Sequence, residues 1–291
     1  MILVVGSTGM VGSGVCLGLA AQGKAVRALV RETSDPTKVD KLRGQGIEIF
    51  MGDLRDPASL KSACEGIETV VDTVSAVPFS YVPGQNDLQN VDTNGAKSLI
   101  DAAKAAGVKH FIYTSFSKNM DADFPLRNAK REVEAYLKTS GLTYTILRPG
   151  YFMEAWLSPM VGFDAENAKA TIYGSGDQPI SYISLVDAIQ FEVASVTSPA
   201  ARDNVLEVGG PQPVSPNEVV KLFEAKSGKT FETSYVPAEA LKGQMEGATD
   251  PMQKSFAGLM YCYALGDPID MQAVLQAFPL KLTFVQEFVN R

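Results

Sequence analysis

The sequence predicts an α/β protein built on a doubly wound parallel sheet, with a smaller and partly helical region after it. Three observations predict this class. Short apolar runs alternate with helical patterns through the first half of the chain, which is typical of parallel strands covered on both faces. A glycine-rich turn follows the first of these runs. Near residue 150 the alternation ends, and the chain becomes rich in turns.

Each element of the first half follows from its own pattern. Strands are expected where β-branched and other apolar residues run together, at 2–6, 25–30, 47–53, 69–74, 110–115 and 144–150. Helices are expected where apolar residues recur at helical spacing, over 10–22, near 55–65, over 87–106 and over 124–137. Right-handed crossovers between the strands then place helices on both faces of the sheet.

The second half predicts fewer elements. A strand–helix unit is expected over 180–196 and a strand over 204–210. Ser215 and Glu218 have the spacing of a capping box, with Pro216 at the first helical position, so a helix begins there. We therefore expect one domain over 1–155 and a second region over 156–291, of which 180–210 partly returns to the sheet.

Composition restricts the partners. The 291 residues are 45% apolar and 20% charged, and the net charge is −7 with no block of consecutive Lys or Arg. This argues against a nucleic-acid or anionic-membrane surface, so a small-molecule partner is expected. No apolar run approaches the length of a membrane span. Met1 leads directly into an apolar strand, so no signal peptide is expected.

The cysteines and the histidine argue against a metal site. Cys16, Cys64 and Cys262 are odd in number and lack paired spacing, which fits reduced thiols and a cytoplasmic location. His110 is the only histidine and lies within an apolar run, where a structural role is expected. One histidine and scattered cysteines cannot easily form a zinc site or a Ser-His-Asp triad. The sequence leaves a homodimer open.

The first glycine-rich turn, GSTGMVGSG, places Gly6, Gly9 and Gly12 between a strand and a helix. Glycines there permit a tight turn and close approach of the backbone to a pyrophosphate, and the helix N-terminus supplies N–H groups. A turn without a ligand is the alternative. The position at the start of a βαβ unit favours a dinucleotide site of the Rossmann type.

The end of the second strand indicates which dinucleotide binds. NAD sites place an acidic residue there to bind the ribose 2′-hydroxyl, but this chain has Arg31. A guanidinium binds a 2′-phosphate through charge-assisted hydrogen bonds, so NADP(H) is favoured over NAD(H). Glu32 follows directly, and a loop that turned it inward would restore the NAD pattern. Arg31 as a solvated turn residue is the remaining alternative.

The helix over 124–137 raises a question about Lys130. At helical spacing, Leu126, Ala129, Val133 and Leu137 form its buried stripe, and Lys130 falls on the flank of that stripe. The lysine is either a surface residue that snorkels along the apolar stripe or a functional residue of the site.

Longer stretches resemble one known family. They are VVGSTGMVGSGV, VRALVRE, GDLRD, AAKAAGVKHFIYTS, LKTSGLTYTILRPGYFMEA and NVLEVGGPQPVS. The chain resembles, over nearly its whole length and most specifically in its first 155 residues, the NmrA-like group of atypical short-chain dehydrogenases/reductases. The resemblance implies a Rossmann NAD(P)-binding domain, a small substrate domain and a preference for NADP(H). Members include quinone reductases, isoflavone-reductase-like enzymes and proteins that only sense the nicotinamide pool.

The resemblance also implies site residues. The residues implied to bind the pyrophosphate are Gly6, Thr8, Gly9, Met10, Val11 and Gly12, and the residue implied to bind the 2′-phosphate is Arg31. Those implied to lie beside adenine are Asp53 and Leu54. Those implied to lie along the ribose and nicotinamide are Thr73, Val74, Ser75 and Lys130, and those implied beside the nicotinamide are Pro149, Gly150, Tyr151 and Phe152.

The implied catalytic group is incomplete. Reductases of the wider superfamily use a YxxxK pair, in which tyrosine donates a proton and lysine holds the nicotinamide ribose. Here the lysine is Lys130, but the tyrosine position is Leu126, and a leucine cannot donate a proton. The serine of the superfamily falls near Ser115, with Thr114 and Phe116 as neighbouring registers. Lys130, Ser115 and Tyr151 are therefore the candidate catalytic residues.

These observations lead to one main function and two alternatives. We expect an NADPH-dependent oxidoreductase that transfers hydride to a small, apolar, conjugated acceptor such as a quinone or enone, which needs no tyrosine acid. The acceptor pocket is expected to be lined by Phe79, Tyr81, Phe152 and Trp156, although each is also a plausible packing residue. A redox-sensing protein that binds NADP(H) and acts through protein partners is the first alternative. A non-redox activity on a nucleotide sugar, or of the lyase type, is the second.

Overall fold

The computed structural model describes residues 1–77 and 80–291. The chain forms two compact units, each built from three separate segments. Unit 1 comprises Met1–Ser115, Asn128–Leu147 and Ile189–Leu206. Unit 2 comprises Phe116–Arg127, Arg148–Ala188 and Glu207–Arg291.

The main sheet confirms the predicted fold class. In the described part of the chain it has seven strands in the order β3-β2-β1-β4-β5-β6-β9, a doubly wound order whose reversal lies between β1 and β4. The pairings from β3 through β6 are all parallel. The strands are β1 (Ile2–Val5), β2 (Val26–Val30), β3 (Glu48–Met51), β4 (Thr69–Asp72), β5 (His110–Thr114), β6 (Thr143–Pro149) and β9 (Asn204–Val208).

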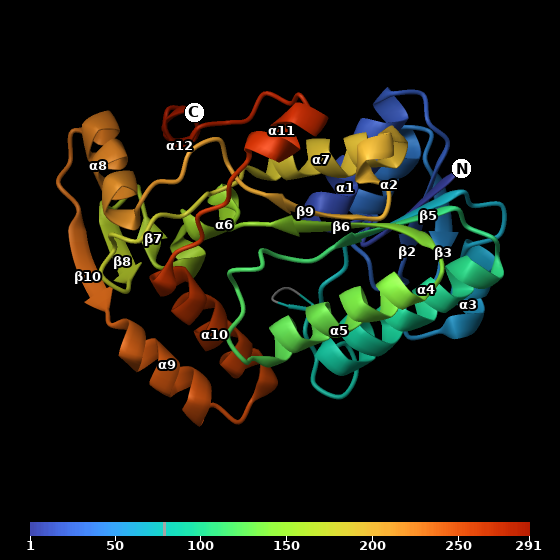
Figure 1. Cartoon of the computed structure of the whole chain (residues 1–291), viewed down its shortest axis with the longest axis horizontal. Helices are drawn as coiled ribbons and strands as arrows, with labels where there is room; N and C mark the ends of the chain where they lie inside the picture. The colour runs from blue at the N-terminus through green and yellow to red at the C-terminus, as the bar shows by residue number, and fades with distance from the viewer. Residues whose placement is uncertain (78–79) are drawn as a thin grey trace. The chain divides into compact units, whose positions relative to one another are not determined.

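Helices cover both faces of the sheet (Figure 1). One face carries α3 (Pro57–Ala63), α4 (Ala96–Ala105) and α5 (Pro125–Thr139), and the other carries α1 (Met10–Ala21), α2 (Pro36–Gly44) and α7 (Leu185–Thr197). Glycines let α1 and α7 approach closely, because a Cβ at Gly14 would lie 2.2 Å from the Ile189 side chain. The main core of unit 1 lies under α3, α4 and α5, where Phe111, Leu99 and Val133 are completely buried.

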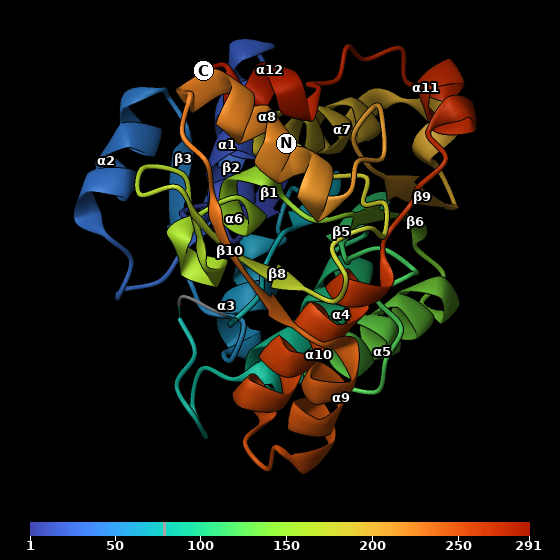
Figure 2. The ribbon, with the colours of Figure 1, turned by 90° about the vertical axis from the view of Figure 1, so that its left-hand side faces the viewer.

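Unit 2 contains a second, three-stranded sheet in the order β10-β8-β7 within the described residues (Figure 2). Its strands are β7 (Phe163–Asp164), β8 (Lys169–Tyr173) and β10 (Glu232–Val236). The helices of this unit are α6 (Met153–Trp156), α8 (Pro216–Ser227), α9 (Ala238–Gly247), α10 (Pro251–Leu265), α11 (Gln272–Ala277) and α12 (Val285–Val289), with short 3₁₀ turns at η2 (Pro159–Val161) in unit 2 and η3 (Pro199–Ala201) in unit 1.

The predicted helix start at Pro216 is confirmed. The Ser215 side chain accepts a hydrogen bond from the Glu218 N–H, and the Glu218 carboxylate accepts one from the Ser215 N–H at 2.7 Å. This reciprocal pair satisfies two N–H groups that the helix would otherwise leave open. The sequence did not predict β7, β8, β10 or the four helices after α8.

The helix expected over 87–106 is divided. Its first part is the π-helix η1 (Leu88–Gly95), and only Ala96–Ala105 forms the α-helix α4. Gly95 lies at the change, where a Cβ would stand 2.8 Å from the Cβ of Leu54. This close approach explains why residue 95 is a glycine. The π-helix itself is of interest because π-helices often occur near functional sites.

The division of the chain differs from the single boundary expected at residue 155. Residues 116–127 belong to unit 2, because the Ser117 hydroxyl donates to Asp267 at 2.6 Å and the Leu126 N–H donates to the Ser255 hydroxyl at 3.1 Å. Residues 189–206 belong to unit 1, and β9 joins the main sheet. The return to the sheet expected within 180–210 is therefore present in β9.

Candidate functional site

The glycine loop lies between β1 and α1 in the shape that a pyrophosphate requires. Gly6 has φ +80°, a conformation that L side chains rarely adopt. A Cβ at Gly12 would lie 2.3 Å from the Gly6 carbonyl oxygen, and one at Gly9 would lie 3.1 Å from it. Gly9 precedes α1 and offers no side chain to the first N–H groups of the helix. A bare backbone and an uncapped helix start fit a bound phosphate.

The end of β4 lies against this loop. The Thr73 hydroxyl donates to the Val5 carbonyl at 3.0 Å, and it would be 2.7 Å from a Cβ at either Gly6 or Gly12. The Val74 side chain would be 3.1 Å from the Cβ at Gly6. Thr73 and Val74, which were expected along the ribose and nicotinamide, therefore adjoin the expected pyrophosphate site.

Arg31 follows β2 and is half-buried. Its Nη1 donates to the Asn86 amide oxygen at 2.8 Å. Glu32 is exposed, so the inward orientation that would restore an NAD pattern is absent. The Lys38 ammonium lies 3.4 Å from the Thr8 carbonyl oxygen, which places a second cation beside the glycine loop. Lys38 was not predicted from the sequence, although Asp35-Pro36 is a usual helix start and places Lys38 in the first turn of α2.

Asp53 and Leu54, expected beside adenine, follow β3. The Asp53 carboxylate pairs with Arg55 at 2.6 Å, and this hydrogen bond is the largest cause that lowers the pKa of Asp53. Its N–H donates to the Ser59 hydroxyl at 3.1 Å. Leu54 is buried and packs at Gly95 of the π-helix. Their contact with adenine stays a prediction.

Lys130 is buried, with 5% of its surface exposed, so the snorkelling interpretation is wrong. Its ammonium donates to the Val74 carbonyl at 2.8 Å and to the Thr114 carbonyl at 3.3 Å. It lies 5.0 Å from the centre of the Tyr113 ring and 3.9 Å from Asp92 Oδ1. Lys130 thus joins the carboxyl ends of β4 and β5, where open α/β sheets bind ligands.

Two buried carboxyl groups accompany this lysine. Asp92 Oδ2 accepts from the Ala76 N–H at 2.9 Å, while Oδ1 is buried without a hydrogen-bond partner among the described residues. Burial raises the pKa of Asp92, and the Lys130 ammonium opposes that rise. Asp72 accepts from the Val74 N–H at 3.0 Å, and burial raises its pKa to about 6 despite the same ammonium. The ammonium is therefore the main local counter-charge.

Ser115, a candidate catalytic residue, already has a partner for its proton. Its hydroxyl donates to Glu134 Oε1 at 2.5 Å. Arg131 donates to the same carboxylate oxygen at 2.8 Å and to the Ser115 oxygen at 3.3 Å. The three side chains form a buried or half-buried group in unit 1. A catalytic role for Ser115 stays a prediction.

Tyr151 and Trp156 lie in an aromatic cluster of unit 2. The Tyr151 hydroxyl donates to the Leu259 carbonyl at 3.1 Å, and burial raises its pKa well above the ordinary value. The Trp156 ring stacks on Tyr263 at 4.6 Å and meets Tyr151 edge-on at 4.5 Å. These contacts favour packing roles, an alternative that the sequence left open for Trp156 but not for Tyr151. Catalysis by Tyr151 stays a prediction.

The other residues expected beside the nicotinamide, Pro149, Gly150 and Phe152, also belong to unit 2. Pro149 is the last residue of β6. The Gly150 N–H donates to the Val208 carbonyl at 2.9 Å. Phe152 forms an isolated parallel bridge with Ile183. Their contact with the coenzyme is not tested by these interactions and stays a prediction.

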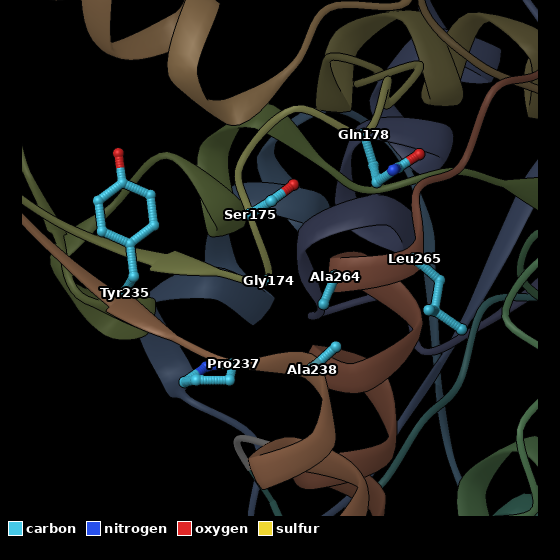
Figure 3. Close-up of a pocket in the computed structure, with 8 residues that line it drawn as sticks. All are labelled: Gly174, Ser175, Gln178, Tyr235, Pro237, Ala238, Ala264 and Leu265. Carbon is cyan, nitrogen blue, oxygen red and sulfur yellow. The ribbon is translucent and has the colours of Figure 1, made fainter.

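The expected acceptor wall is described only in part. Tyr81 is partly buried and packs against the core of unit 1, whereas Phe79 lies outside the described residues. Unit 2 also contains a cavity of about 620 Å³ (Figure 3). Tyr81, Phe152 and Trp156 do not line it; the described lining residues are Gly174, Ser175, Gln178, Tyr235, Pro237, Ala238, Ala264 and Leu265.

Two general findings concern membranes and metals. Among the described residues, no helix has the length and apolar character needed to cross a membrane. Nor does the described part of the chain place three or more His, Cys, Asp or Glu side chains where they could hold a metal ion.

The strand order, the bare glycine loop and the buried lysine at the end of the sheet are together typical of a Rossmann-type protein that binds a dinucleotide. Comparison with known proteins then gives the family. A model of the NmrA-like family matches residues 1–289, so the chain belongs to that family. Within it, the chain is an NAD(P)H-dependent reductase of the atypical short-chain dehydrogenase/reductase type, and its coenzyme is NADP(H).

Three similar proteins show the range of the family. The chain is 31% identical to an isoflavone reductase homologue, IRL, from Zea mays, over 100% of this chain and 97% of the relative. It is 32% identical to an NAD(P)H azoreductase from Xenophilus azovorans, over 96% and 92%. A crystal structure of an NADPH-dependent quinone oxidoreductase from Escherichia coli with NADPH has a TM-score of 0.78 at 26% identity, over 99% and 98%.

Proposed function

We propose that this oxidoreductase transfers hydride from NADPH to a small, apolar, conjugated acceptor, with a quinone as the best substrate class and an enone as the next. The observation that carries the proposal is the pair of Lys130 and Leu126. The ammonium is buried at the carboxyl ends of β4 and β5, while one helical turn earlier the side chain is a buried leucine. The site has a cation but no phenol at that position.

The acceptor class follows from the proton that each reaction needs. Hydride transfer to an aldehyde leaves an alkoxide, a strong base that requires a positioned acid. Hydride transfer to a quinone leaves a hydroquinone anion, a much weaker base that can take its proton from water. A positioned general acid contributes typically ~10²–10⁴ in rate. Without a phenol at the position of Leu126, quinones therefore keep most of their rate, whereas aldehydes lose the contribution of a positioned acid there.

The residues of the chain have positioning roles in this reaction. NADPH supplies the hydride when it is bound. The glycine loop and the start of α1 bind the pyrophosphate, Arg31 binds the 2′-phosphate, and Lys130 donates a hydrogen bond to the nicotinamide ribose. Two of the three ammonium protons of Lys130 are directed to carbonyl oxygens, and the third would donate to the ribose, since Asp92 Oδ1 at 3.9 Å is beyond hydrogen-bond distance.

Two of the relatives support the acceptor class. One is named as an azoreductase and one as a quinone oxidoreductase, and both names describe reduction of conjugated, electron-poor groups. The redox-sensor alternative is supported by the same Leu126, because a protein that only binds NADP(H) needs no acid. A homodimer and a cytoplasmic location remain predictions.

The test is a steady-state screen of NADPH oxidation against matched quinones, enones and aldehydes. We expect kcat/KM for quinones to exceed that for aldehydes by roughly 10²–10⁴. Fast aldehyde reduction with slow quinone reduction would contradict the proposal and indicate an unrecognised acid such as Ser115 or Tyr151. Tight NADPH binding without turnover of any acceptor would favour the sensor.

A further inference from the structure

We propose that Asn86 determines the preference of this enzyme for NADPH over NADH, because it holds the Arg31 guanidinium in place for the 2′-phosphate. Asn86 lies in a turn between β4 and the π-helix, 55 residues away from Arg31 in the sequence. The inference rests on the proposed binding of the 2′-phosphate by Arg31 and adds to it the residue that fixes the orientation of that side chain.

The contact between the two side chains is direct. Arg31 Nη1 donates to the Asn86 amide oxygen at 2.8 Å, and Asn86 is buried, with 6% of its surface exposed. An arginine side chain has many rotamers in solution, and ordering it costs free energy whenever a ligand binds. A guanidinium already held by a buried acceptor avoids part of that cost.

Asn86 is itself fixed by the turn in which it lies. Its amide nitrogen donates to the Ser80 hydroxyl at 3.0 Å and also to the Ser80 carbonyl. Its backbone forms a two-way pair with Val82, with distances of 2.8 and 2.9 Å. Since the amide nitrogen is directed at Ser80, the amide oxygen faces Arg31, and the reverse orientation would place two donors against each other.

A neutral acceptor suits this position better than an acid. An aspartate would pair with the guanidinium and repel a 2′-phosphate, whereas the amide oxygen orients Arg31 and leaves its charge unmatched. Asp53, which follows β3, acts on Arg31 only through space, because its carboxylate is paired with Arg55 at 2.6 Å. The guanidinium thus keeps its full charge and its remaining N–H donors for the phosphate.

The test measures the dissociation constants of NADPH and NADH by calorimetry for the full-length wild type, Asn86→Ala, Asn86→Asp and Gln85→Ala. We expect Asn86→Ala to weaken NADPH about ten-fold, with NADH changed less than two-fold. Asn86→Asp should remove the NADPH preference entirely. Gln85→Ala, at an exposed position of the same turn, should leave both constants unchanged. Retained NADH binding shows in each variant that the site is folded.

Arg31→Ala and the double variant separate this inference from the proposed function. In the Arg31→Ala background, Asn86→Ala should have no further effect on the ratio of the two constants. If Arg31→Ala itself leaves that ratio unchanged, the role of Arg31 in the proposed function fails. If Arg31→Ala lowers the ratio but Asn86→Ala does not, or if NADPH and NADH weaken equally in Asn86→Ala, the role of Asn86 is overturned.

Discussion

Lys130 shows how a single buried cation is placed at a sheet end. The side chain leaves α5 and reaches two backbone carbonyls, the Tyr113 ring and the Asp92 carboxylate. A buried ammonium is stable only with such partners, and removing it would leave oxygen atoms unsatisfied. The same partners fix the position from which it would contact a ribose.

The variant Lys130→Met tests this contact, because methionine keeps most of the length of the side chain and removes the charge. We expect NADPH binding to weaken by roughly 1–3 kcal/mol, the range for a hydrogen bond to a charged group, and quinone reduction to fall with it. Calorimetry and steady-state rates on folded protein provide the measurement. The control is Lys97→Met, whose ammonium pairs with Glu132 at 2.5 Å on the helix surface. Equal effects of the two variants would exclude a ligand role for Lys130.

His110 makes the contacts of a buried structural residue, as its position in an apolar run predicted. Its Nε2 lies 2.7 Å from the Thr145 hydroxyl, and that hydroxyl donates to the Ala201 carbonyl at 2.7 Å. The hydroxyl has one proton, so Nε2 must carry the donor proton towards Thr145. Nδ1 is buried and has no hydrogen-bond partner in the described part of the chain. The imidazole is therefore neutral in the folded chain.

A pH titration followed by NMR tests this state, since one histidine gives one set of imidazole signals. Burial lowers the pKa of His110 from 6.5 to about 4, so we expect no titration between pH 8 and about pH 5. The folded state binds fewer protons than the unfolded state between the two pKa values. The resulting stability is present above pH ~6.5 and is lost as the pH falls towards ~4. A midpoint near 6.5 would contradict the buried neutral form.

At the scale of elements, α7 brings an acid to the back of β5. The Thr114 hydroxyl donates to Glu192 Oε1 at 2.6 Å, and Oε2 is buried with no hydrogen-bond partner within residues 1–77 and 80–291. Burial, as the largest cause, raises the pKa of Glu192 from 4.5 to about 8. The helix approaches this closely because Gly14 and Gly18 of α1 leave space for Ile189 and Val193.

Glu192→Gln should remove a pH dependence of stability. In the wild type, the folded chain holds a proton on Glu192 between pH ~4.5 and ~8 that the unfolded chain releases, so this contribution is present below pH ~4.5 and is lost as the pH rises through ~8. The amide keeps the hydrogen bond without an ionisable group. We expect urea unfolding of the variant to show more stability than the wild type above pH ~8 and little difference below pH ~5. Parallel pH profiles would contradict a raised pKa.

At the scale of the whole molecule, the residues expected to bind NADP(H) are divided between the two units. The glycine loop, Arg31, Thr73, Val74 and Lys130 belong to unit 1, while the residues from Gly150 to Phe152 belong to unit 2. Coenzyme contact is thus a prediction for residues of each unit, and it can be tested in each unit by itself.

Hydrogen–deuterium exchange tests this prediction. We expect NADP⁺ to slow exchange at the amides of residues 6–12 and also at those of residues 150–152. In Gly9→Ala, whose added Cβ would lie 3.1 Å from the Gly6 carbonyl, the fold needs only a small shift, but the methyl group occupies space beside the phosphate. Protection should then be lost in both segments. Protection of residues 6–12 alone in the wild type would remove Gly150, Tyr151 and Phe152 from the coenzyme site.

The sequence determined the features that depend on local pattern. Apolar runs and helical spacing predicted the six strands of the first half, and the capping residues predicted the start of α8. The glycine loop and Arg31 were also recognisable, because backbone clearance and phosphate charge require particular residue types at fixed places in a βαβ unit. Arg31 by itself favoured NADP(H), and the family resemblance added a coenzyme role for Lys130.

Only the tertiary structure decided the features that depend on contacts between distant residues. It buried Lys130 against Val74 and Asp92, placed Asn86 on Arg31 and Glu192 on Thr114, and assigned residues 116–127 to unit 2. None of these partners shares a helical or strand period with the residue that it contacts, so no local pattern predicts them. From the sequence alone, a charged or amide side chain is expected at the surface. Only the tertiary structure shows that such a side chain is buried and which partner it contacts.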